Sequence, residues 1–171
     1  MKKFIISIDA GTTSNRSILF DIKGNPVFSS QKEFTQYFPK SGWVEHNADE
    51  IWKTTIKTLK DVIKKARSLK GKILSIGITN QRETTVLWDK KTGKPVYKAI
   101  VWQDRRTEEF CKKLRKQNKD TMVFNKTGLL IDSYFSGTKI KWILDNVPQA
   151  RQLMNKKQLL FGTIDSFLIW R

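Results

Sequence analysis

The N-terminal part of the chain alternates between short apolar runs and polar stretches. The apolar runs lie at 4–8, 17–21 and 27–30, and a Lys-Gly-Asn-Pro segment at 23–26 separates the last two. Short apolar runs bounded by turn-forming residues are typical of strands joined by tight turns. The sequence therefore predicts a three-stranded antiparallel meander, with residues 9–16 as its first turn.

A helical pattern replaces this alternation after Asn47, which together with Glu50 resembles a capping box. Beyond Asn47, apolar residues recur with helical spacing and mark the face that we expect to be buried. These residues are Ile51, Trp52, Ile56, Leu59, Ile63 and Ala66.

The remaining pattern mixes strands and helices around a loop at 128–135. It predicts strands at 73–78, 86–88, 96–102 and 159–161, and helices at 107–114, 136–146 and 163–170. A meander followed by helix–strand crossovers indicates an α/β fold with a mixed β-sheet of the ribonuclease H-like kind, the unit of actin-like ATPases and sugar kinases. The last helix reaches Arg171 with an apolar face and no stop signal, so we expect residues 1–171 to be one incomplete domain.

Composition indicates a globular chain of 171 residues, with 39% hydrophobic residues and a mean hydropathy of -0.48. No apolar run approaches the roughly 20 residues that a membrane-spanning helix needs. Cys111 is the only cysteine, so an intrachain disulfide is excluded, and this suits the cytoplasm. His46 is the only histidine, which excludes a His-rich metal site within the chain.

The net charge is +17, and two interpretations compete for it. One is a nucleic-acid-binding surface, and the other is a set of lysines on solvated helix faces. Most of the lysines lie in helical-looking segments such as 53–72 and 112–119, between apolar positions, and not in one tail. This distribution favours solvated faces, and we expect no nucleic-acid partner.

The stretch 77–85 places a block of polar residues directly after an apolar strand. Within it, Arg82 offers a fork of donors and Glu83 offers two acceptor oxygens, so the pair can hold vicinal hydroxyl groups from both sides. The competing interpretation is a salt bridge or an ordinary turn. The stretch is therefore a candidate binding site for a small polyhydroxy ligand.

The predicted turn at 9–16 has features of a phosphate site. Gly11 permits a tight turn, the hydroxyl residues at 12–14 supply donors, and Arg16 suits a phosphate group. Asp9 ends a buried strand and is placed to hold a hydrated Mg²⁺. An ordinary polar hairpin would explain the glycine and the hydroxyls but not Asp9. No Walker-type Gly-x-x-x-x-Gly-Lys-Ser/Thr motif occurs in the chain.

Several motifs together resemble those of glycerol kinases, which belong to the FGGY carbohydrate kinases. They run in the family's order at 9–16, 42–46, 77–85, 93–95, 99–106, 134–139 and 160–163. Asn-Gln-Arg-Glu at 80–83 and Trp-Gln-Asp-Arg-Arg at 102–106 occur together, which is closer to glycerol kinases than to xylulose- or gluconate-type relatives. The chain departs from the family pattern at Ala10, where Gln is usual, and at Asn15, where Ser is common.

The resemblance implies roles for individual residues. Those matching the glycerol site are Arg82, Glu83, Trp102 as an aromatic wall, and Tyr134. Those matching the nucleotide-phosphate turn are Thr12, Thr13, Ser14 and Arg16, with Asp9 associated with Mg²⁺ through water. Taken without the family, Trp102 would be assigned to core packing and Tyr134 to anchoring a loop.

The resemblance also implies an activity, together with a catalytic residue that this chain is expected to lack. Members transfer the γ-phosphoryl group of MgATP to glycerol, giving ADP and sn-glycerol 3-phosphate, and are expected to be cytoplasmic homo-oligomers. The family's general-base aspartate is expected beyond residue 171, so this chain carries no predicted catalytic residue and is expected to be inactive alone. One alternative is a non-catalytic remnant that binds a polyol or a partner protein. A basic ribonuclease H-like nucleic-acid binder is disfavoured, because Asp9 lacks the further clustered carboxylates that such nucleases need.

Overall fold

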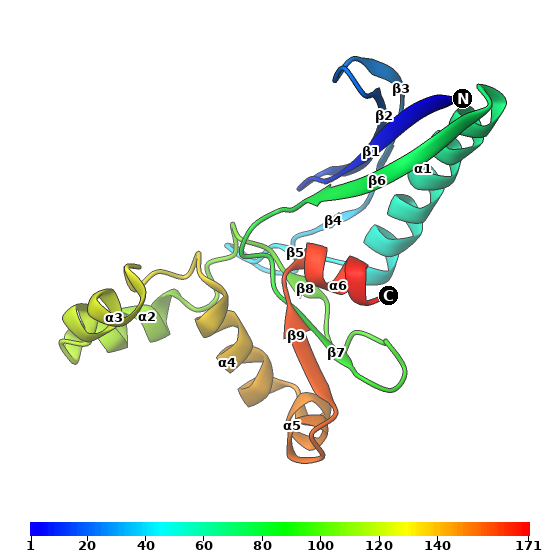
Figure 1. Cartoon of the computed structure of the whole chain (residues 1–171). Helices are drawn as coiled ribbons and strands as arrows, with labels where there is room; N and C mark the ends of the chain where they lie inside the picture. The colour runs from blue at the N-terminus through cyan, green and yellow to red at the C-terminus, as the bar shows by residue number, and fades with distance from the viewer. The chain divides into compact units, whose positions relative to one another are not determined.

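Figure 1 shows the computed structural model, which describes residues 1–171. The chain forms two compact units, each built from separate segments of sequence. The first unit comprises Met1–Gln36, Asn47–Gln81 and Ile164–Arg171, and the second comprises Tyr37–His46 and Arg82–Thr163.

The first unit is built on a four-stranded mixed sheet with the order β3-β2-β1-β6 (Figure 1). Its strands are β1 (Lys2–Ala10), β2 (Ser14–Asp21), β3 (Pro26–Glu33) and β6 (Gly71–Thr79). β1 and β2 are antiparallel, as are β2 and β3, whereas β6 runs parallel to β1. The predicted meander and mixed sheet are confirmed, although the first turn is shorter than expected because both strands extend into it.

The crossover between β3 and β6 contains α1 (Ala48–Ser68), whose start is fixed by Asn47. Asn47 Oδ1 accepts hydrogen bonds from the backbone N–H groups of Asp49 at 3.0 Å and Glu50 at 3.3 Å. The carboxylate of Glu50 does not return to Asn47, because it accepts from the N–H and hydroxyl of Thr35, both at 3.1 Å. The N-cap prediction is therefore right, and the reciprocal half of the capping box is wrong.

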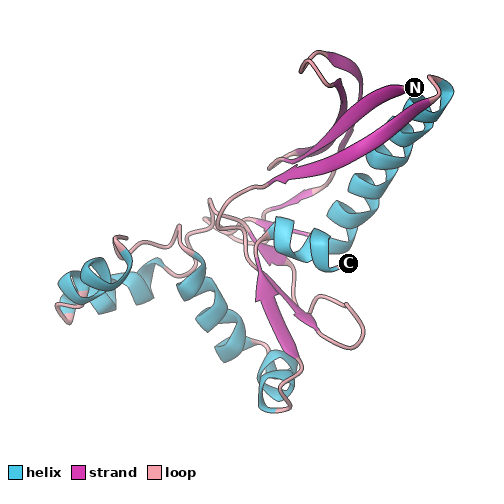
Figure 2. Ribbon diagram, viewed as in Figure 1, coloured by secondary structure: helices cyan, strands magenta, loops and turns pink.

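In the first unit α1 lies along the sheet (Figure 2), and the core lies between them. This core is more polar than predicted. Its buried apolar residues are Phe4, Ile6, Ile8, Leu19, Val62 and Ala66. Ile51 and Ala66 are buried as expected, but Thr54, Thr55 and Thr58 are buried as well, and Trp52, Ile56, Leu59 and Ile63 are only partly buried. The helix turns its threonines inward because polar residues of β2 face them. Asn15 Nδ2 donates to Thr54 Oγ1 at 2.6 Å, and the hydroxyls of Ser17 and Thr58 lie 2.9 Å apart.

The C-terminal helix α6 (Ile164–Trp170) belongs to the same unit. It buries Ile164, Phe167 and Leu168. The adjoining Arg171 forms an ion pair with Asp49 of α1, with an N–O distance of 2.5 Å. The predicted helix at 163–170 is therefore confirmed to within one residue.

The second unit combines short strands with helices. The chain enters it at β4 (Gln36–Tyr37), β5 (Glu45–His46) pairs antiparallel with β8 (Ala99–Ile100), and β7 (Val86–Asp89) pairs antiparallel with β9 (Leu159–Gly162). Its helices are α2 (Glu108–Lys116), α3 (Asp120–Thr127), α4 (Ser136–Asn146) and α5 (Pro148–Asn155). Leu87, Ile100, Ile143 and Ala150 form its buried apolar cluster.

Two helices of this unit were not predicted, and one predicted strand is much shorter. None of the residues of α3 is buried, so its sequence lacks the periodic apolar pattern from which a helix is predicted. α5 begins with Pro148 in its first turn, a position where proline favours the start of a helix, although proline in a sequence also marks the end of the preceding helix. Of the strand expected at 96–102, only Ala99–Ile100 forms, because β5 offers it just two partners. No helix in the structure combines the length and the apolar character that crossing a membrane would require.

Candidate functional site

The turn between β1 and β2 in the first unit has its carbonyl oxygens engaged by the protein itself. Those of residues 11–13 accept hydrogen bonds from Gln81 Nε2 at 3.2 Å, Gln36 Nε2 at 3.1 Å and the Phe34 N–H at 3.3 Å, respectively. The Gly11 N–H closes the turn by donating to the Ser14 carbonyl at 3.0 Å. Because these carbonyl oxygens are engaged, the groups that the turn can present to a bound anion are N–H and hydroxyl donors.

The tightness of this turn favours glycine at position 11. A Cβ atom at that position would lie 3.0 Å from the Ser14 carbonyl oxygen, which is backbone and cannot move aside easily. The role that the sequence predicts for this glycine therefore has a direct steric basis.

The side chains of Ser14 and Arg16 are connected through Gln31 on β3. Gln31 Nε2 donates to Ser14 Oγ at 2.9 Å, and Arg16 Nε donates to Gln31 Oε1 at 2.9 Å. Arg16 is exposed and pairs in register with both Gln31 and Asp9. Asn15, between them, is buried and donates to α1, as the alternation of a strand requires. The sequence did not identify Gln31, although its place opposite Arg16 follows from the hairpin register.

Asp9 stands at the end of β1 and is partly buried. No cluster of three or more His, Cys, Asp or Glu residues able to hold a metal ion occurs in the chain. A single carboxylate does not form an all-protein metal site. It does suit Mg²⁺, which usually keeps several waters and takes one or two carboxylates together with phosphate oxygens.

In the second unit, Glu83 lies in a turn with a φ of 64°, in the left-handed region. Its Oε2 atom accepts hydrogen bonds from the backbone N–H of Ser136 at 2.8 Å and from the Ser136 hydroxyl at 2.7 Å, at the first residue of α4. A carboxylate is favoured there by the unpaired N–H groups and the helix dipole. Arg82 is exposed and forms no ion pair. The alternative of an Arg82–Glu83 salt bridge is thus wrong, while that of a turn is correct for the backbone.

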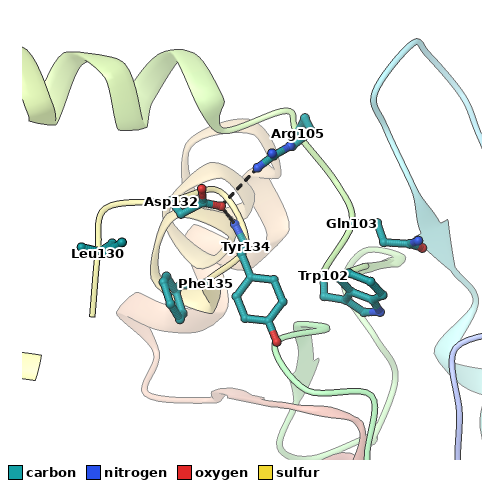
Figure 3. A pocket seen from close by; sticks show the side chains of 7 residues that line it. All are labelled: Trp102, Gln103, Arg105, Leu130, Asp132, Tyr134 and Phe135. Carbon is teal, nitrogen blue, oxygen red and sulfur yellow. Dashed lines mark hydrogen bonds and ion pairs between the residues drawn. The ribbon is translucent and has the colours of Figure 1, made fainter. Parts of the chain in front are cut away.

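Trp102 and Tyr134 line the same cavity, which has a volume of about 530 Å³ (Figure 3). Their ring centroids are 6.0 Å apart and their planes meet at 69°. The other lining residues are Gln103, Arg105, Leu130, Asp132 and Phe135. Both aromatic rings are partly exposed, so Trp102 is a cavity wall and not only a part of the core.

The loop that carries Tyr134 is fixed from two sides. The Tyr134 N–H donates to Asp132 Oδ1 at 2.7 Å, and Arg105 Nη1 reaches the same oxygen at 3.1 Å (Figure 3). On the other side, Lys139 Nζ donates to the carbonyl oxygens of Tyr134 and Phe135. The loop-anchor role considered for Tyr134 therefore describes its backbone, while its ring faces the cavity.

Lys139 was not identified from the sequence, and its side chain is fully buried. Burial lowers the pKa of its ammonium group from 10.5 to about 8. The negative charges of Glu83 and Asp104 act to raise this pKa, but burial outweighs them. Its spacing could have indicated that Lys139 is buried, because it stands four residues before the buried Ile143 on the inward face of α4.

Arg106 occupies a second buried polar cluster of the unit. Its Nη2 atom lies 2.9 Å from Glu45 Oε1 and 2.8 Å from Asp104 Oδ2, and its guanidinium carbon lies 3.8 Å from the ring centroid of Trp43. Burial acts to lower the pKa of Arg106, but the hydrogen bonds and charges of Asp104 and Glu45 outweigh it and raise the pKa overall. Because Asp104 Oδ2 also accepts from the Val44 N–H at 2.6 Å, the cluster fixes the segment that follows Trp102.

Residues 4–171 match the family model described as the FGGY family of carbohydrate kinases, N-terminal domain. The chain belongs to the FGGY family. The family membership and the α/β fold expected from the sequence motifs are both confirmed.

Among curated relatives of this FGGY chain, glycerol kinase from Oceanobacillus iheyensis is 61% identical over 170 residues, and glycerol kinase from Malacoplasma penetrans is 60% identical over 170 residues. Each alignment covers 99% of this chain and 34% of the relative, so the chain spans about a third of their length.

Solved structures of the family agree with the fold. The crystal structure of Plasmodium falciparum glycerol kinase with ADP has a TM-score of 0.93 and 35% identity, covering 99% of this chain and 34% of that one. Gluconate kinase from Lactobacillus acidophilus has a TM-score of 0.84 at 22% identity, covering 99% and 33%, and shows the fold alone. The higher identity to the glycerol kinase agrees with the preference drawn from the motifs at 80–83 and 102–106.

Proposed function

We propose that this FGGY chain is the N-terminal part of a glycerol kinase and that residues 1–171 form an incomplete N-terminal domain. The reaction would be ATP-dependent phosphorylation of glycerol to sn-glycerol 3-phosphate in the cytoplasm, by a homo-oligomeric enzyme. The observation that carries the proposal is the cavity walled by Trp102 and Tyr134, in a unit where Glu83 and Tyr134 are both bonded to the first turn of α4. The names of the most similar relatives support the same substrate.

Glycerol would be held by its oxygens and enclosed by aromatic rings. Arg82 would donate to one hydroxyl group, Glu83 would accept from another through Oε1 because Oε2 is bonded to Ser136, and the Tyr134 phenol would contact a third. The Trp102 ring would pack against the carbon chain and reject bulkier polyols. This combination suits a small polyol better than an acid or a nucleotide.

The turn at residues 11–14 would bind nucleotide phosphates. Its backbone N–H groups, the hydroxyls of Thr12, Thr13 and Ser14, and the Arg16 guanidinium are donors suited to ATP and ADP. Mg²⁺, associated with Asp9 through water, would neutralise charge on the phosphates. ADP in the Plasmodium falciparum relative supports this assignment. We assign no general base in the chain, so we expect it to bind glycerol without phosphorylating it.

Calorimetric titration of the purified chain with glycerol tests this function. We expect a dissociation constant within the roughly 1 μM to 1 mM range of typical enzyme substrates. Glu83→Ala should abolish measurable binding, whereas Glu109→Ala, which removes an exposed carboxylate on α2, should leave it within about twofold. A chain that is folded by circular dichroism but gives no heat with glycerol would refute the proposal. A coupled assay should detect no turnover.

A further inference from the structure

One of the largest fully buried side chains in the molecule belongs to a lysine. Lys139 has a relative exposure of 0% and lies in the first turns of α4. Lysine is almost never fully buried without a paired charge, yet the hydrogen bonds of the Lys139 ammonium group go to backbone carbonyls and not to a carboxylate. Its burial therefore needs an explanation other than a buried salt bridge.

The ammonium group is directed at backbone carbonyls. Nζ donates to the carbonyl oxygen of Tyr134 and, at 3.5 Å, to that of Phe135, and it lies 5.9 Å from the centroid of the Tyr134 ring. These two residues directly precede α4 and line the cavity walled by Trp102. The buried charge thus acts on the segment that presents Tyr134.

Stability alone does not favour a lysine at this position. Burial penalises the charged amine, and a cation near a helix N-terminus also opposes the helix dipole. A methionine of similar length would fill the same space without either penalty. Residues that break such local rules are expected at functional sites.

We propose that Lys139 is a positioning residue of the glycerol site, which holds the Tyr134 and Phe135 carbonyls so that the Tyr134 ring faces Trp102 and the start of α4 stays bonded to Glu83. The inference rests on the function proposed above. Lys139 touches no substrate atom in this role and acts through Tyr134 and Glu83.

The test measures glycerol affinity by calorimetry from pH 6.5 to 9.5 for the wild-type chain, Lys139→Met, Lys139→Arg and Lys141→Met. Lys141 is exposed on the same helix and provides the matched loss of charge. At pH 7 we expect Lys139→Met to weaken binding at least tenfold, with Lys141→Met within twofold of wild type. A role in packing alone would be preserved by methionine.

The pH profile separates positioning from packing. As Lys139 loses its proton near pH 8, wild-type affinity should fall several-fold, Lys139→Arg should show no fall, and Lys139→Met should be weak and flat. The other titratable groups that face Lys139 are the Glu83, Asp104 and Asp132 carboxyls, the Cys111 thiol and the Tyr134 phenol. Titration of any of these would appear equally in Lys139→Arg, which therefore serves as the control.

The outcomes distinguish this inference from the proposed function. Glycerol binding that is equal in wild type and Lys139→Met, or a wild-type profile that is flat across pH 8, would overturn the role of Lys139 and leave the proposed function standing. If Lys139→Met does not fold, the comparison of wild type with Lys139→Arg decides. No binding by the folded wild-type chain would refute the function and this role together.

Discussion

Replacing Lys139 by methionine should make the folded chain more stable at neutral pH. Burial lowers the pKa of the Lys139 ammonium group from 10.5 to about 8. At about 1.36 kcal/mol per pKa unit, this difference means that the buried charge destabilises the folded state by about 3 kcal/mol. Methionine removes that penalty but also removes the bonds to the Tyr134 and Phe135 carbonyls, which together contribute about 1–2 kcal/mol. We therefore expect a net gain of about 1–2 kcal/mol at pH 7.

The sign of the pH dependence follows from proton binding. Below pH 8, Lys139 is protonated in both the folded and the unfolded chain, and the full penalty is present. Between pH 8 and 10.5 the unfolded chain binds the proton more tightly, so the free energy of unfolding rises with pH. The wild-type chain should therefore gain about 3 kcal/mol from this group across that window, and Lys139→Met should gain nothing from it.

Urea unfolding at intervals from pH 7 to 10.5, followed by circular dichroism, measures this effect as the difference between the two proteins. The difference cancels groups that do not interact with Lys139, such as Tyr97, whose pKa is raised by burial and which acts in the opposite direction. Lys141→Met should show the same rise between pH 8 and 10.5 as wild type, because it removes an exposed lysine of the same helix and leaves Lys139 in place. Parallel curves for wild type and Lys139→Met would show that no desolvated charge exists at this position.

Two further substitutions test the packing that supports the two units. Arg106→Met leaves Asp104 buried without its cation and leaves Glu45 with only the more distant Lys98, at 4.0 Å. It should lower the free energy of unfolding in urea by about 3–5 kcal/mol, whereas Arg105→Met, which removes an exposed guanidinium, should lower it by less than about 1 kcal/mol; equal losses would contradict the buried cluster. Gly71→Ala places a Cβ atom 2.1 Å from the Phe4 ring and should lower the free energy of unfolding by about 1–3 kcal/mol, measured by thermal unfolding. Gly77→Ala is the control, because a Cβ atom there would meet no other atom within 4 Å. A Gly71→Ala protein as stable as wild type would refute this packing.

The fold could be predicted from the sequence where partners are close along the chain. The β1–β2–β3 meander depends on tight turns, and the start of α1 depends on Asn47 and its immediate neighbours. The bounds of α4 also follow from local periodicity. Each of these features is decided within a few residues, so a pattern in one sequence carries it.

The supporting residues of both sites could not be predicted, because their partners are distant in sequence. Gln81 bonds to a carbonyl 70 residues away, and Arg106 pairs with a glutamate 61 residues away. The buried threonines of α1 likewise depend on polar residues of β2, such as Asn15 facing Thr54 39 residues away. Residue types alone indicated the turn at 9–16 and the pair Arg82–Glu83, whereas the hydrogen bonds that fix them appear only once the chain is folded.

Glu83, which is bonded to the start of α4, also has a locally unfavourable feature, because its backbone lies in the left-handed region. A non-glycine residue in the left-handed region costs about 1–2 kcal/mol, and glycine at this position would avoid the strain. The Glu83 carboxylate offsets part of that cost through Ser136, yet this uses Oε2 alone and leaves Oε1 without a hydrogen bond in the structure. Folding alone poorly explains why Glu83 adopts a strained backbone while only one of its two carboxylate oxygens is bonded. It also poorly explains why Lys139 buries a cation whose hydrogen bonds go only to the backbone of Tyr134 and Phe135. Both are explained if the first turn of α4 serves to present an acceptor oxygen and an aromatic ring to a ligand with hydroxyl groups.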